Sequence, residues 1–100
     1  MEPGIPDISI SDVVLSTAGR DQGKLFYCVG TDDQFVLLAD GKGRTLDKPK
    51  RKKRKHVQKV LRAETRVALK LRNSDKVLNS ELRRDLQFHA VKMQSNKLGG

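Results

Sequence analysis

Short apolar runs separated by turn-forming residues occupy the first sixty positions of the chain. Residues 13–15, 25–29 and 35–39 are rich in β-branched and aromatic side chains, which favour strands, and glycine and aspartate recur between them. Residues 44–46 predict a short fourth strand, and the alternation of polar and apolar residues over 55–60 predicts a fifth. Five short strands at this spacing indicate a small, mainly β barrel.

Beyond residue 61 the apolar positions take on the spacing of a helix. Residues 64–71 place apolar side chains on one helix face, until residues 73–75 interrupt the pattern. Asn79 or Ser80 is a capping residue for a second helix, in which four apolar side chains recur at helical spacing. These are Leu82, Leu86, Ala90 and Met93. We therefore expect an irregular arm over residues 1–9, the strand-rich domain over 10–61, a helical tail over 62–94 and a frayed end over 95–100.

The size and composition of the chain fit one small domain. It has 100 residues, of which 36% are apolar, enough for a single modest core. No segment approaches the length of an apolar transmembrane helix, and the N-terminal residues lack the basic start and apolar centre of a signal peptide. The one cysteine, Cys28, has no partner for an intramolecular disulfide, and its place in an apolar strand predicts a buried, inert thiol. These features predict a cytoplasmic protein without a membrane partner.

Positive charge is concentrated in the second half of the chain. The net charge is +9, but residues 1–47 sum to −4 and residues 48–100 to +13. Seven cations lie within eight residues, in a segment that we expect to be a solvated loop after the fourth strand. They are Lys48, Lys50, Arg51, Lys52, Lys53, Arg54 and Lys55. This basic run predicts contact with a polyanion, whose condensed counterions are released on binding; a solubilising linker, an import signal or a membrane contact are the alternatives.

A second candidate contact lies in the loop of residues 19–23. Two glycines bracket its charged tip, and glycine allows the backbone to approach a ligand closely. Arg20 is therefore a candidate phosphate contact, and a plain turn in which Arg20 pairs with Asp21 is equally compatible with the sequence. The candidate patch also includes Lys24, Lys42 and Arg44.

The sequence offers little for catalysis. His56 and His89 have no Cys or His neighbour at the spacing of metal ligands, and Asp32 and Asp33 belong to a turn. His56, beside the basic run, is either a stacking face for RNA or a solvent-facing strand residue, and His89 is expected to be an ordinary helix position. We therefore expect no enzyme activity, no metal, no cofactor and no small-molecule substrate.

Aromatic residues are scarce. Three of the four, Phe26, Tyr27 and Phe35, fall in predicted strands, and Phe88 falls in the second helix. Neighbouring strand residues point to opposite faces, so at least one of Phe26 and Tyr27 is expected in the core. So few rings favour recognition of folded RNA by charge and shape over stacking on successive bases.

Three motifs, in order along the chain, resemble a known family. Residues 19–23 (Gly-Arg-Asp-Gln-Gly), set between two apolar runs, resemble the KOW motif of small SH3-like barrels that bind RNA. Residues 37–41 (Leu-Leu-Ala-Asp-Gly) and 48–52 (Lys-Pro-Lys-Arg-Lys) follow as in short bacterial KOW-domain RNA-binding proteins, which are similar to the fourteen-e family of archaeal and eukaryotic large-subunit ribosomal proteins. The resemblance covers residues 12–58. It implies an SH3-like barrel whose loop places Arg20 beside the phosphate backbone of ribosomal RNA.

The sequence thus predicts a small SH3-like (KOW) barrel of about five strands with a C-terminal α-helical appendage. Its predicted function is non-catalytic binding of structured RNA, specifically large-subunit ribosomal RNA, as a ribosomal or ribosome-associated protein, with ribosomal proteins as further candidate partners. The predicted RNA-binding residues are Arg20, Lys24, Lys42, Arg44, Lys48, Lys50, Arg51, Lys52, Lys53, Arg54, Lys55 and His56. Two alternatives stay open: a protein-interaction module that docks an acidic partner, with the apolar helix stripe in a groove, and a transcription-associated KOW factor.

Overall fold

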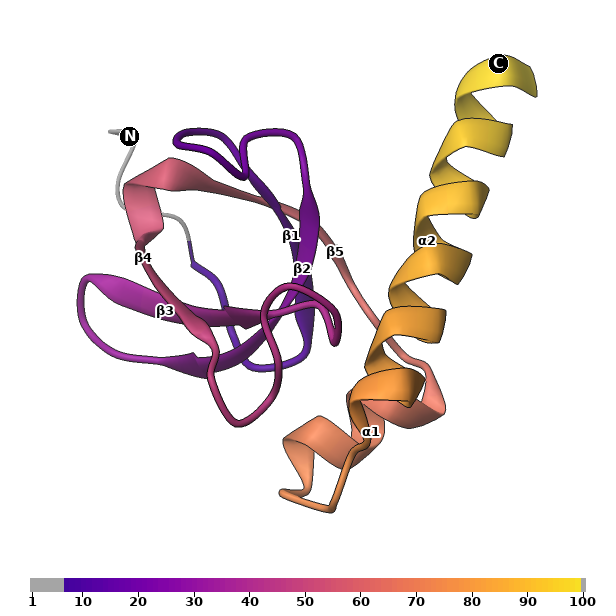
Figure 1. Ribbon diagram of the computed structural model, residues 1–100. Helices are drawn as coiled ribbons and strands as arrows, with labels where there is room; N and C mark the ends of the chain where they lie inside the picture. The colour runs from indigo at the N-terminus through magenta and orange to yellow at the C-terminus, as the bar shows by residue number, and fades with distance from the viewer. Residues whose placement is uncertain (1–6, 100) are drawn as a thin grey trace.

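The computed structural model describes residues 7–99, with side chains up to Met93, and it consists of one antiparallel sheet followed by two helices (Figure 1). The strands are β1 (Asp12–Ser16), β2 (Leu25–Thr31), β3 (Phe35–Ala39), β4 (Lys50–Lys53) and β5 (Val57–Arg62). They are hydrogen-bonded in the order β4-β3-β2-β1-β5, and the short 3-10 helix η1 (Arg54–His56) joins the two edge strands. The predicted five-stranded β domain with a helical tail is confirmed at this level.

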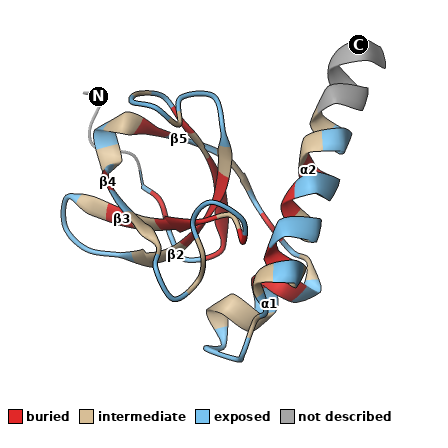
Figure 2. Cartoon of the chain, in the orientation of Figure 1, coloured by how far each residue is buried: buried red, intermediate tan, exposed pale blue. Residues whose placement is uncertain are grey.

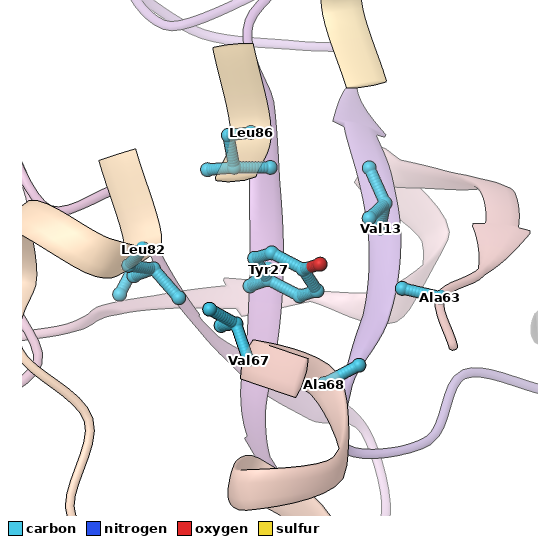
Figure 3. Close-up of a cluster of buried hydrophobic side chains, with 8 residues drawn as sticks. Val13, Tyr27, Ala63, Val67, Ala68, Leu82 and Leu86 are labelled. Atoms are coloured by element: carbon cyan, nitrogen blue, oxygen red, sulfur yellow. The ribbon is translucent and has the colours of Figure 1, made fainter. Parts of the chain in front are cut away.

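The helical tail covers the outer face of β1 and β2, so that both faces of these two strands are buried (Figures 1 and 2). Phe26 and Tyr27 are neighbours on β2, and they point to opposite faces. Phe26 joins an inner cluster. Tyr27 joins the outer cluster, against Leu82, Leu86 and Val67 of the helices (Figure 3). The expectation that at least one of the two rings is buried is confirmed, and both are.

Local contacts define where the helices begin. α1 (Arg66–Arg72) is capped by Thr65, whose Oγ1 accepts a 3.2 Å hydrogen bond from the amide of Ala68. Neither predicted capping residue precedes α2 (Asn79–Gly99), because Asn79 is already its first residue, and the Asn79 side chain serves another purpose. Its Oδ1 accepts a 2.8 Å hydrogen bond from the amide of Leu46 and so ties the β3–β4 loop to the helix. Among the described helices, none has the length and the apolar character needed to cross a bilayer.

Gly41 allows the β3–β4 loop to approach α2. Its φ is +81°, which side-chain-bearing residues rarely adopt, and a Cβ at this position would collide with the backbone of Asn79. The Gly41 carbonyl accepts a 3.1 Å hydrogen bond from Arg83. The loop is therefore held against the first turns of α2.

The predicted position of the fourth strand is wrong. Within residues 44–46 only Thr45 makes a strand-like bridge, an isolated one with Lys48, and the true β4 lies inside the basic run. The physical reason is Asp40, whose Oδ1 accepts 2.9 Å hydrogen bonds from the amides of Lys42 and Arg44 and so holds that segment in a loop. The basic run is accordingly not a solvated loop, since Lys50–Lys53 pairs with β3.

The predicted boundaries shift at three other places. The fifth strand starts at Val57 rather than at residue 55, because residues 54–56 form η1. In the predicted N-terminal arm, Ile8 is buried in the inner cluster, and residues 1–6 lie outside the described residues. At the other end, α2 includes residues 95–99, where the sequence predicted a frayed end, and residue 100 lies outside the described residues.

Candidate nucleic-acid interface

The β1–β2 loop and the β3–β4 loop enclose a recess of about 340 Å³ whose wall is rich in cations. We call it the basic recess, and its cationic residues are Arg20, Lys24, Arg44, Lys50 and Lys52. These five come from two loops and one strand, so that the fold gathers cations that are up to 32 positions apart in sequence. All five belong to the residues that the sequence predicts to bind RNA.

Two glycines and a set of backbone hydrogen bonds shape the β1–β2 loop. Gly19 and Gly23 have φ values of +85° and +89°. The amide of Gly23 donates a 2.8 Å hydrogen bond to the Ser16 carbonyl, and the amide of Lys24 donates one of 3.0 Å to the Asp21 carbonyl. The loop is therefore a tight, internally bonded turn that presents Arg20 at its exposed tip.

Lys52 supports this loop from the sheet. Its side chain is only 8% exposed, and its Nζ donates hydrogen bonds to Asp21 Oδ1 at 2.5 Å and to the Ala18 carbonyl at 2.6 Å. Ser16 Oγ donates a further 2.9 Å hydrogen bond to the same Asp21 oxygen. Asp21 thus pairs with Lys52, and the alternative pair of Asp21 with Arg20 is not formed.

The Asp21–Lys52 pair cancels one positive charge of the recess. Burial raises the pKa of the Asp21 carboxyl, but the hydrogen bonds from Lys52 and Ser16 and the charge of Lys52 outweigh burial and hold the pKa below its usual 3.8. Asp21 is therefore ionised at neutral pH. A second carboxylate, Asp40, also lines the recess, and its Oδ1 accepts hydrogen bonds from the amides of Lys42 and Arg44. Four cations are left for a ligand, and none of them forms an ion pair with a described residue: Arg20, Lys24, Arg44 and Lys50.

Other cations of the basic run are either exposed to solvent or bonded to the backbone. Lys48, Lys53 and Lys55 are exposed and form no ion pair with any described residue. Arg54 instead donates hydrogen bonds to the carbonyls of Asp32 at 3.0 Å and Ile8 at 3.1 Å, and so ties the N-terminal arm to the β2–β3 turn.

The other predicted contacts lie outside the recess. Arg51 stacks on Phe35 on the other face of β4. Lys42 lines a separate groove beside α2. His56 is half-buried in η1, and its carbonyl accepts a 2.9 Å hydrogen bond from the amide of Thr17. The structure therefore brings together the loop cations and part of the basic run, but not the whole predicted set.

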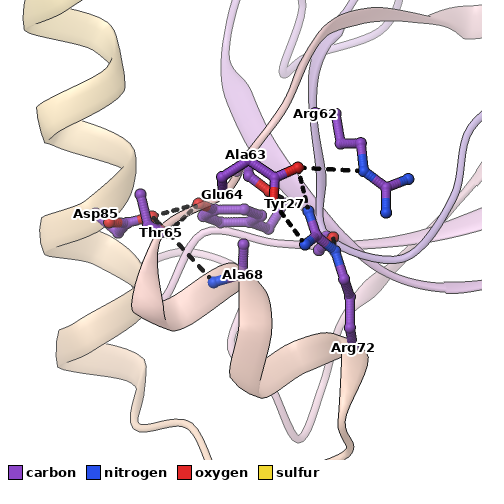
Figure 4. A network of polar contacts seen from close by, with 9 residues as sticks. Tyr27, Arg62, Ala63, Glu64, Thr65, Ala68, Arg72 and Asp85 are labelled. Atoms are coloured by element: carbon purple, nitrogen blue, oxygen red, sulfur yellow. Dashed lines mark hydrogen bonds and ion pairs between the residues drawn. The ribbon is translucent and has the colours of Figure 1, made fainter.

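A buried polar cluster that the sequence pattern did not predict lies between the sheet and the helices (Figure 4). The Tyr27 hydroxyl donates to Asp85 Oδ2 and lies 3.1 Å from His89 Nε2, and Thr65 Oγ1 donates to the same Asp85 oxygen at 2.9 Å. Burial, followed by the hydrogen bond to Asp85, raises the pKa of Tyr27 and keeps its hydroxyl protonated. These contacts fix α2 on the sheet. A signal for them exists in the sequence, since Asp85 and His89 share the helix face of Leu82.

Two further observations concern the cysteine and the residues that could bind a metal. Cys28 is fully buried, as predicted, and burial raises its pKa to about 11. Within residues 7–99, no three His, Cys, Asp or Glu side chains come together as metal ligands would.

Comparisons with known proteins assign the chain to no family. No protein-family model matches the chain, and a search of curated proteins gives no match either. The residues and their geometry therefore carry the assignment of function.

Proposed function

We propose that this protein binds structured RNA without catalysing a reaction, and that the basic recess contacts the phosphate backbone. The observation that carries the proposal is the gathering of Arg20, Lys24, Arg44 and Lys50, free of ion pairs to the described residues, around one concave surface. Phosphates are the ligands that such a surface favours, because each neutralised phosphate releases condensed counterions.

The chemistry of the four cations fits a phosphate backbone. Arg20 and Arg44 carry planar guanidinium groups that can bind a phosphate through two hydrogen bonds, and Lys24 and Lys50 add compact charges. The tight turn that holds Arg20 limits the conformational entropy lost on binding. The net charge of +13 over residues 48–100 would attract a polyanion from a distance.

The arrangement of the strands supports the finer assignment to an SH3-like barrel of the KOW type. The order β4-β3-β2-β1-β5, with a 3-10 turn between the edge strands, resembles that of SH3-like barrels. The glycine-bracketed loop follows β1, at the place where the KOW motif lies in the resembling family. On this basis we propose ribosomal RNA as the ligand and the cytoplasmic ribosome, or its assembly, as the setting.

Sedimentation of a cell extract through a sucrose gradient tests this proposal. We expect the protein to migrate with the large ribosomal subunit at low salt and to leave that fraction after nuclease digestion. If the protein still migrates with the large subunit at high salt, it is a stable ribosomal component, and if high salt releases it, it is an accessory factor. A protein that stays at the top of every gradient contradicts the ribosomal assignment, and efficient competition by duplex DNA favours a transcription-associated factor.

A second candidate function, binding of an acidic protein segment, is favoured by a groove of about 610 Å³ between the sheet and α2. Its apolar wall is formed by Leu15, Leu25, Leu86, Ala90 and Met93. Two cations, Lys42 and Arg83, and one carboxylate, Asp40, lie in the same wall, and this excess of positive charge suits a partner with acidic residues beside apolar anchors. This candidate predicts a complex that survives nuclease digestion and is lost in an Ala90→Trp variant, in which the larger side chain fills the groove.

A further inference from the structure

Arg51 forms a flat, exposed platform on the face of β4 opposite to the basic recess. Its guanidinium carbon lies 3.6 Å from the centre of the Phe35 ring, and its Nη2 lies 3.8 Å from Asp32 Oδ2. The two stacked residues belong to paired strands, since Arg51 lies opposite Leu37, two positions along from Phe35 on β3. The Phe35 ring lies against the guanidinium, and about 60% of the Arg51 side chain remains exposed, so that the side chain is accessible to a second planar group.

The β2–β3 turn holds this platform in place. Asp32 Oδ1 accepts hydrogen bonds from the amides of Gln34 at 3.2 Å and Phe35 at 2.9 Å, while Asp32 Oδ2 faces Arg51. Asp32 thereby fixes both the turn and the guanidinium. Asp33 and Gln34 complete a shallow notch of about 390 Å³ around Arg51 and Phe35, and the Asp33 carboxylate forms no hydrogen bond or ion pair with a described residue.

We propose that this notch binds one unpaired guanine base of the RNA, an inference that rests on the proposed function. The base stacks on the accessible guanidinium of Arg51, as bases in single-stranded RNA stack on arginine planes and aromatic rings. Its N1–H and N2–H donate hydrogen bonds to the Asp33 carboxylate. A carboxylate only accepts hydrogen bonds and repels phosphate, so it selects a base edge with two adjacent donors, which adenine and uracil lack.

The position of Arg51 relative to the recess supports this assignment. Lys50 and Arg51 are consecutive on β4, so their side chains point to opposite faces of the strand. Lys50 faces the basic recess, and Arg51 faces the notch. One RNA segment that crosses this edge strand would therefore meet a phosphate contact and a base contact at adjacent residues.

Binding of two RNA hairpins that differ only in one bulged guanine tests the proposal. We expect the unmodified protein to bind the bulged hairpin about fivefold or more tightly, the lower end of what one stacked base contributes. Arg51→Lys keeps the charge but removes the plane, and Asp33→Asn replaces one acceptor by a donor. Each substitution should bring the affinity ratio of the two hairpins close to one. Lys53→Ala, which removes a neighbouring exposed cation from the same face, should weaken both hairpins alike and preserve the ratio.

The possible results separate the guanine site from the proposed function. Equal binding of the two hairpins by the unmodified protein would overturn the guanine site and leave RNA binding through the recess intact. A preference for the bulged hairpin that persists in Arg51→Lys and Asp33→Asn would also overturn it. Failure of the unmodified protein to bind either hairpin would contradict both proposals. A fluorescent guanine analogue in the bulge, quenched on binding to the unmodified protein but not to Arg51→Lys, would support the stacked geometry directly.

Discussion

Within the basic run, Lys52→Ala should destabilise the fold far more than Lys53→Ala, although the two substitutions remove the same charge. The Lys52 side chain is 8% exposed and its partner Asp21 is 13% exposed, whereas Lys53 lies in solvent. Without Lys52, the largely buried Asp21 carboxylate loses the one cationic partner that it has among the described residues, and its Oδ2 already has no hydrogen bond within that part of the chain. Breaking a buried pair in this way costs about 3 kcal/mol or more, while an exposed substitution costs at most about 0.5 kcal/mol.

Thermal unfolding followed by far-UV circular dichroism measures this difference. For a domain of this size, 1 kcal/mol lowers Tm by about 4–8 °C, so Lys52→Ala should lower Tm by about 12 °C or more and Lys53→Ala by less than about 4 °C. Adding Asp21→Asn to Lys52→Ala should recover part of the loss, because the unpaired carboxylate is then gone. Equal changes in Tm for the two single variants would refute the assignment of Lys52 to a structural role.

The pH dependence of Tm in the unmodified protein and in Lys52→Ala gives an independent check of the ion pair. Since the pKa of Asp21 is lowered in the folded state, its stabilising contribution is present above the unfolded value of 3.8 and is lost as pH falls through the folded pKa. The Tm difference between the unmodified protein and Lys52→Ala should therefore be full at neutral pH and shrink below about pH 3.8. A difference that does not change with pH would argue that lost packing, rather than the ion pair, accounts for the effect.

Other parts of the fold make equally specific predictions. Leu82→Ala removes a fully buried side chain between α2 and the sheet and should cost about 2–5 kcal/mol in urea unfolding, whereas Leu78→Ala, at a 52% exposed residue, should cost less than about 0.5 kcal/mol; similar costs would contradict the observed packing of α2. Cys28, buried with a pKa of about 11, should resist alkylation at neutral pH until the protein is unfolded by guanidinium, and fast alkylation of the native protein would show that the site is open. Tyr27 is the only tyrosine, and its pKa is raised in the folded protein. The stability that it contributes is therefore full below the unfolded pKa of 10.0 and is lost as pH rises from there through the higher folded pKa. Its tyrosinate absorbance should accordingly appear above pH 10 and together with loss of circular dichroism; titration near pH 10 without unfolding would exclude the buried hydrogen bond to Asp85.

The strands that carry apolar side chains could be predicted from the sequence, and the strand that carries charge could not. β2 and β3 lie where runs of β-branched and aromatic residues place them. β4 consists of four cations, which by local pattern alone indicate a solvated segment. Backbone pairing with β3 and the bonds of Lys52 to Asp21 and Ala18 determine its structure, and these partners are distant in sequence.

The candidate site was predictable in its charge but not in its geometry. The sequence identified Arg20 and Lys50 as cations near turn-forming residues, but only the fold places them in one recess and separates Arg51 onto the opposite face of β4. Lys52 and Arg54 look like their neighbours in the basic run. Their intramolecular partners, Asp21 for one and the carbonyls of Asp32 and Ile8 for the other, depend on contacts that no local pattern reveals.

The central claim, that the basic recess contacts RNA phosphates, is tested most directly by the salt dependence of RNA binding in two variants of equal charge. One variant replaces the recess residues Arg20, Lys24, Arg44 and Lys50 by Ala, and the other replaces the exposed cations Arg66, Lys76, Arg84 and Lys92 by Ala. The slope of log K against log salt should flatten by about 3 in the recess variant and change little in the control variant. Equal slopes in the two variants would contradict the claim, because net charge rather than the recess would then account for binding.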